Sequence, residues 1–124
     1  MVKEGWIFAK VSAATKAGLD PMNFKRIGVE EARNLISAST DKPVQIVDIR
    51  DDASFAAGHI ETATHLHGSN VQEFVDDADP EAPLLVYCYH GNMSQSAAAY
   101  FADQGFAEAY SLDGGYEAWA QDKD

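Results

Sequence analysis

The sequence predicts an α/β fold in which a central parallel sheet of about five strands carries helices on both faces. Short runs of β-branched and apolar residues alternate along the chain with segments whose apolar residues recur at helical spacing. Strands that are joined through helices pair in parallel, and the helices then cover the two faces of the sheet. With 124 residues, the chain is long enough for one domain with a single core.

The strand segments are short and bounded by residues that favour turns. They are expected at 24–27, 44–49, 64–67, 84–88 and 109–112. Segment 44–49 is mostly β-branched and segment 84–88 is apolar, which is typical of strands that are buried on both faces. Segment 64–67 is the weakest of the five.

Helices are expected between these strands and after the last one. The first begins at 29 and ends between 37 and 40. The others are expected at 51–57, 70–78, 94–104 and after position 115. Gly58 suits a left-handed cap at the end of the second helix, and Asn70 can cap the third. Asp113 is expected to cap the last helix, with Gly114 and Gly115 allowing its turn to approach the loop that follows position 88.

Residues 1–21 differ from the rest of the chain. The apolar run 6–9 is too short for the core of a signal peptide, and Lys10 interrupts it. A domain is therefore expected at 22–124. Residues 1–21 are expected to be a leader or extension that is disordered, added for expression, or the product of an upstream start. The alternative is an N-terminal strand or arm packed on the domain.

The charge of the chain is strongly acidic, with 9 Lys and Arg against 20 Asp and Glu and a net charge of −11. Residues 51–122 contain thirteen of these acidic residues and no Lys or Arg. Such a field repels nucleic acid and anionic membrane surfaces, so neither is expected as a partner. No apolar run approaches the ~20 residues that span a bilayer. An anion site in this half must use backbone N–H groups and helix ends.

Cys88 is the only cysteine, and it stands where the strand 84–88 gives way to a polar loop before the helix 94–104. Backbone N–H groups of such a turn converge on one point, and the following helix adds positive potential. Gly91 permits a close backbone approach, and Ser94 can cap the helix. These donors favour thiolate over thiol, so Cys88 is the expected nucleophile. The alternative is an inert buried cysteine.

A single cysteine excludes an internal disulfide, and no Cys and His spacing typical of a metal site is present. A reducing cytoplasm is the expected location. Phosphate chemistry is disfavoured, because the sixth residue after Cys88 is Ser94 rather than the arginine that would clamp a phosphoryl group. A cysteine phosphatase or arsenate reductase is therefore the less favoured alternative.

Three motifs, in this order along the chain, resemble the rhodanese-domain family, specifically its single-domain bacterial thiosulfate sulfurtransferases of the GlpE type. Asp-Ile-Arg-Asp at 48–51 and Phe-Ala-Ala-Gly-His-Ile at 55–60 resemble the N-terminal signature. Cys-Tyr-His-Gly-Asn at 88–92, followed by Ser94, is similar to the active-site loop. Leu-Asp-Gly-Gly-Tyr-Glu-Ala-Trp at 112–119 resembles the C-terminal signature. The resemblance runs from Phe24 to Trp119.

The resemblance implies a sulfurtransferase that works by double displacement without a metal or organic cofactor. The Cys88 thiolate would take the sulfane sulfur of thiosulfate, release sulfite and carry a persulfide. Cyanide, a small thiol or a thioredoxin-like protein would then accept the sulfur. The family's catalytic residue maps onto Cys88, and its substrate loop maps onto Tyr89, His90, Gly91, Asn92, Met93 and Ser94. The alternative is a non-catalytic module that binds a partner, although such modules typically lack the cysteine.

The sequence departs from the family pattern in two places. Glu61-Thr62 stands where Pro-Gly is common, so that turn is expected to differ. No basic residue lies near the loop in sequence, so weak binding of thiosulfate is expected.

The other conspicuous residues have structural interpretations. His59 is expected to be buried against a carboxylate such as Asp48, and Arg50 is expected to form a structural ion pair. His65 and His67 are expected to be structural. His90 has two open interpretations, as a group that tunes the thiolate or binds substrate, or as a loop residue that faces water.

Overall fold

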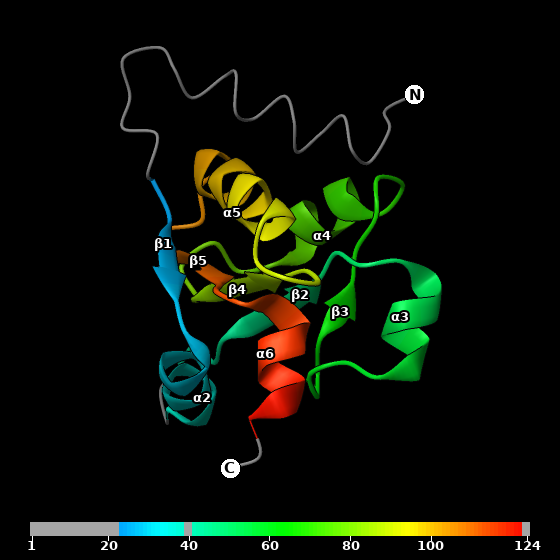
Figure 1. Cartoon of the computed structure of the whole chain (residues 1–124). Coiled ribbons are helices and arrows are strands. Elements are labelled where there is room, and N and C mark those ends of the chain that lie inside the picture. Colours follow the sequence, from blue (N-terminus) through cyan, green and yellow to red (C-terminus); the bar gives the residue numbers. More distant parts are fainter. Residues whose placement is uncertain (1–22, 39–40, 123–124) are drawn as a thin grey trace.

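A computed structural model describes residues 23–38 and 41–122, and its centre is a five-stranded sheet in which every pairing is parallel. The strands are β1 (Lys25–Ile27), β2 (Gln45–Asp48), β3 (Thr64–His65), β4 (Leu84–Tyr87) and β5 (Ala109–Leu112). Their order across the sheet is β1-β5-β4-β2-β3, which places β4 at the centre (Figure 1). The expected parallel sheet is thus confirmed, and the expected leader at 1–21 lies outside the described residues.

The helices are α2 (Val29–Ser37), α3 (Asp52–Ala57), α4 (Val71–Asp77), α5 (Met93–Asp103) and α6 (Gly115–Gln121). Helices α4 and α5 cover one face of the sheet, α2 and α6 cover the other, and α3 lies to the side of β3 (Figure 1). Strand β4 alternates between these two layers. Leu84 and Val86 pack on the α4 and α5 side, whereas Leu85 and Tyr87 pack on the α2 and α6 side, as the two-residue period of a strand requires.

Gly58 stands at the C-cap of α3 as expected but without a left-handed backbone, and the expected cap of α6 by Asp113 is wrong. The N-cap of α6 is Gly114 in the left-handed region, and the Asp113 carboxylate instead accepts a hydrogen bond from Arg26 Nε at 2.9 Å. Gly58 follows α3 with extended backbone (φ 168°), and its carbonyl accepts a hydrogen bond from Arg50 Nη2 at 2.6 Å. Asn70 does stand at the N-cap of α4, but its side chain accepts from the backbone N–H of His67.

A buried ion pair lies where β2 ends. Arg50 Nη2 is 2.7 Å from Asp48 Oδ2, and the two side chains are 5% and 0% exposed. The guanidinium also lies over the ring of Tyr116, 4.3 Å from its centroid, so the pair joins β2 to α6. Burial alone would lower the pKa of the Arg50 guanidinium, but the hydrogen bonds and charge of Asp48 outweigh burial and raise it. The structural ion pair expected for Arg50 is present.

His59 does not contact this ion pair, so its expected burial against Asp48 is wrong. Its ring is exposed, stacks on Phe55 with ring centroids 3.8 Å apart, and places Nδ1 2.8 Å from the Phe55 carbonyl oxygen. Arg50 already occupies the Asp48 carboxylate with Nε and Nη2. The site that the imidazole was expected to fill is therefore taken by a guanidinium.

Replacing Arg50 tests how much this buried ion pair contributes to the free energy of unfolding. Arg50→Met keeps a long apolar side chain but leaves Asp48 buried without its counter-charge, so we expect the free energy of unfolding to fall by about 3–5 kcal/mol in urea denaturation. Arg26→Met is the matched control, because it breaks the exposed pair with Asp113, whose side chains are 51% and 42% exposed. That variant should lose at most ~1 kcal/mol. Equal losses in the two variants would contradict the role given to burial.

Candidate active site

Cys88 directly follows β4 and therefore lies at the carboxyl end of the central strand. Ligands of open α/β sheets bind at this end, beyond the last strand residues. The Cys88 side chain is 2% exposed and packs in the core layer that α4 and α5 form with the sheet. Cys88 thus lies between a packed interior and the loop that leads into α5.

Several hydrogen-bonding groups converge on the sulfur of Cys88. The backbone N–H groups of Gly91 and Ser94 both donate to Sγ, each at 3.3 Å. The thiol in turn donates to Ser94 Oγ at 3.4 Å, and that hydroxyl lies 2.8 Å from Ser111 Oγ. If Cys88 is ionised, Ser111 can donate to Ser94 and Ser94 to the sulfur, because hydroxyl hydrogens rotate to suit their partners.

Ser94 was expected to cap α5, and this is wrong. The N-cap is Asn92, so Ser94 is the second residue of the helix. The first N–H groups of a helix have no partner inside the helix, and the N–H of Ser94 uses this freedom to bind the sulfur. The start of α5 therefore supplies a donor to Cys88 instead of receiving a side-chain cap.

The start of α6 holds the loop from the other side. The N–H groups of Tyr116 and Glu117 donate to the carbonyls of Cys88 and Tyr89, at 2.8 and 3.2 Å. Figure 1 shows the loop between β4 and α5 beside the first turn of α6. A Cβ at Gly115, where φ is +59°, would overlap both carbonyl oxygens. The expected approach of the glycine turn to the loop is confirmed.

Gly91 makes the second close backbone contact in the site. Its φ is +98°, and a Cβ there would lie 2.8 Å from the backbone nitrogen of Gly114 and 3.1 Å from the carbonyl oxygen of Leu112. Only a residue without a side chain fits this position. The carbonyl of Gly91 accepts a hydrogen bond from Gln95 Nε2 at 2.9 Å, which fixes the loop to the first turns of α5.

The side chains of Tyr89 and His90 contact carboxylates at the surface. The Tyr89 hydroxyl contacts the carboxylate of Asp51, which also caps α3 through the N–H of Ser54. The Tyr89 hydroxyl and then the Ser54 groups hold the pKa of Asp51 well below its usual range. His90 places Nδ1 2.6 Å from Glu117 Oε1, and both side chains are exposed. Of its two interpretations, the geometry therefore favours a surface role for His90.

Three contributors to the site were missed in the sequence: Asp51, Gln95 and Ser111. Ser111 carried a signal in the sequence, because it is a serine among the otherwise apolar or aromatic residues of 109–112. The structure buries it fully. Asp51 ends the motif at 48–51, but that motif says nothing of its contact with Tyr89. Gln95 stands in a segment where exposed polar residues are ordinary, so nothing in the sequence marks it. His65 and His67 lie away from the loop, beside Phe55 and Ser69.

The chemistry of the site rests on backbone donors and hydroxyls. Within 23–38 and 41–122, no cluster of three or more His, Cys, Asp and Glu side chains could hold a metal ion. In the same part of the chain, none of the helices has the length and hydrophobicity needed to cross a bilayer.

Donors aimed at one sulfur stabilise negative charge on that sulfur or on a group that it carries.

Adding a methyl group at Gly115 tests the backbone contact that holds the loop. Gly115→Ala should lose most of the sulfur-transfer activity that the sequence predicts, because the new Cβ would displace the carbonyls of Cys88 and Tyr89. Gly105→Ala is the control, since φ there is also positive (+110°) but the space around it is open. It should keep its activity and lose about 1–2 kcal/mol of stability from backbone strain. An active Gly115→Ala variant with unchanged kinetics would contradict the contact.

Comparisons with known proteins bear on this site. The family model of the rhodanese-like domain matches residues 29–122. Thiosulfate sulfurtransferase GlpE of Pseudomonas aeruginosa (strain LESB58) is 54% identical over 96 residues, which is 77% of this chain and 84% of the relative. GlpE of Ectopseudomonas mendocina has the same identity and coverage. A crystal structure of a rhodanese-like domain protein from Staphylococcus aureus is 28% identical with a TM-score of 0.66, covering 77% of this chain and 91% of that one. The chain belongs to the family of rhodanese-like domains.

Proposed function

We propose that the protein is a thiosulfate sulfurtransferase that carries the transferred sulfur on Cys88. The names of relatives at 54% identity support the reaction. The observation that carries the role of Cys88 is the pair of backbone N–H groups, from Gly91 and Ser94, that donate to its sulfur. The Ser94 hydroxyl, which accepts from the thiol, can turn to donate once the sulfur is ionised. These groups suit a nucleophile that is negatively charged before and after it accepts a sulfur atom.

The reaction takes two displacements. The Cys88 thiolate attacks the outer sulfur of thiosulfate, the S–S bond of thiosulfate breaks, and sulfite leaves with the electron pair. The persulfide that remains on Cys88 keeps its charge near the N–H groups of Gly91 and Ser94. Ser111 orients the hydroxyl of Ser94, to which it lies 2.8 Å away, and so acts through a neighbour rather than on the sulfur itself.

The second displacement returns the cysteine to its thiolate. Cyanide, a small thiol or a thioredoxin-like protein is the proposed acceptor, with neither nucleic acid nor a membrane surface as partner because of the net charge of −11. A cytoplasmic location fits a chain whose only cysteine is the proposed nucleophile.

Phosphate chemistry is a poorer fit to the same loop. Ser94 occupies the place where a Cys-x5-Arg loop would carry its arginine, and its hydroxyl is engaged with Cys88 and Ser111. Arg50 is buried and paired with Asp48, so it does not replace the missing clamp.

Intact mass spectrometry tests the proposed carrier directly. After incubation with thiosulfate the protein should gain the mass of one sulfur atom, and cyanide should remove it. Cys88→Ser should gain nothing. Ser94→Ala should still form the adduct but about 10- to 100-fold more slowly, as expected for one hydrogen bond to a charged group. An adduct that forms on Cys88→Ser, or none on the natural protein, would refute the proposal.

Salt should reveal the repulsion between the acidic protein and its donor. Residues 51–122 contain no Lys or Arg to attract the thiosulfate dianion. At low ionic strength we expect a KM for thiosulfate near or above ~1 mM. Sodium chloride at ~0.15 M shortens the screening length to ~8 Å and should lower that KM, while kcat stays constant. A KM far below this value that rises with salt would show an attractive site instead.

A further inference from the structure

Two exposed apolar side chains follow Cys88 closely in the chain. Among the described residues, Tyr89 (38% exposed) and Met93 (47% exposed) are the large hydrophobic side chains that remain exposed. Single exposed apolar residues are ordinary on a protein surface. Here, however, both belong to the short stretch that forms the loop over Cys88 and the first residue of α5. The part of the chain that the structure describes therefore presents its large exposed apolar side chains close in sequence to the proposed nucleophile.

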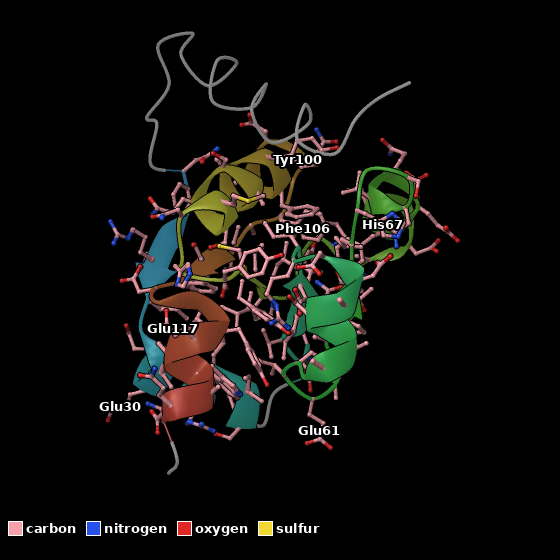
Figure 2. All side chains as sticks on the ribbon, turned by 45° about the vertical axis from the view of Figure 1, so that its right-hand side comes forward. Glu30, Glu61, His67, Tyr100, Phe106 and Glu117 are labelled. Carbon is pink, nitrogen blue, oxygen red and sulfur yellow. The ribbon has the colours of Figure 1, made fainter. Side chains whose placement is uncertain are left out.

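Most of the charged groups around this stretch are carboxylates, and the exposed Arg26 is paired with one of them, Asp113. Asp51 contacts the Tyr89 hydroxyl. Asp52 next to it is 93% exposed, with one carboxylate oxygen 3.4 Å from His65 Nδ1. Glu117 lies in the first turn of α6, where it pairs with His90 (Figure 2). The closest arginine in sequence, Arg50, is buried against Asp48 and does not offset these charges at the surface.

We propose that Tyr89, Met93, Asp51, Asp52 and Glu117 form an acceptor-docking surface for a protein thiol that has basic and apolar residues beside its cysteine. Carboxylates attract and orient a basic partner, and they disfavour an acidic one. Met93 adapts to the shape of a partner, and Tyr89 offers a large area at low entropic cost. A second copy of this chain is a poor occupant, because it would bring carboxylates against carboxylates. This inference rests on the proposed sulfurtransferase function.

Sulfur moves to the acceptor in a single displacement. The acceptor's cysteine thiolate attacks the outer sulfur of the Cys88 persulfide and forms a new S–S bond. The S–S bond to Cys88 breaks, and both of its electrons leave with Cys88 as thiolate. The acceptor departs as a persulfide, and no external oxidant or reductant takes part.

Two peptides can test the charge preference. Each carries one central cysteine between leucines, and they differ only in having lysines or glutamates at their ends. The protein is first loaded with sulfur from thiosulfate, and the rate of sulfur loss to each peptide is followed by intact mass. Lysines also raise the thiolate fraction of a nearby cysteine. Each rate is therefore divided by the rate at which that peptide reacts with iodoacetamide, a neutral reagent.

The corrected rate for the lysine peptide should exceed that for the glutamate peptide by about tenfold or more at low salt, and the advantage should shrink as salt rises. Glu117→Gln should lower the advantage by about two- to fivefold, as expected for one exposed ion pair. Glu81→Gln is the matched control, because it removes an exposed charge just before β4, at the opposite end of that strand from Cys88. It should leave the advantage intact.

The apolar part of the surface has its own test. Met93→Ser should slow transfer to both peptides, and by more than it slows removal of the sulfur by cyanide.

Equal corrected rates for the two peptides, or an advantage that Glu117→Gln and Glu81→Gln change alike, would overturn the docking surface. If the protein gains sulfur from thiosulfate and loses it to cyanide in those same samples, the proposed function stands and only the docking surface fails. If no persulfide forms at all, both proposals fail together.

Discussion

The path of the chain around Cys88 depends on the backbone hydrogen bonds between its loop and the start of α6. The N–H groups of Tyr116 and Glu117 bind the carbonyls of Cys88 and Tyr89, and Gly115 lets the two backbones approach. With these carbonyls held outside, the loop curls back so that its later N–H groups face the sulfur. The start of α6 thus shapes the site without contributing a side chain to the sulfur.

This arrangement would let so acidic a chain hold the anion that is proposed to bind at Cys88. Negative charge near Cys88 is met by backbone dipoles, which do not change with pH and do not need counter-ions. The side chains around the loop can therefore be acidic themselves, as those of Asp51 and Glu117 are. Backbone N–H groups would then bind a small anion at the sulfur, while the carboxylates around the loop would select a larger basic partner.

Much of the fold could be predicted from local pattern. The apolar runs of β2 and β4 and the helical spacing in α2 each report burial directly, and Cys88 was marked by its place between strand and loop. Two of the errors fall where a side chain has a partner far away in sequence, whereas His59 stacks on Phe55 only four residues away. Asp113 pairs with Arg26, which is 87 positions away, and Ser94 meets Ser111 from a neighbouring strand. Pattern within a segment carries no information about such partners.

Cys88 is also a member of the packed layer that includes Val86, Ala97 and Ala98. Interiors of proteins are close-packed, so an atom added at the edge of such a layer must be accommodated by its neighbours. The free and the sulfur-loaded forms of the protein would therefore differ in internal volume as well as in charge. Helix α5 supplies two alanines to that layer and the N–H of Ser94 to the sulfur, so the proposed loading of Cys88 would act on the packing of this helix first.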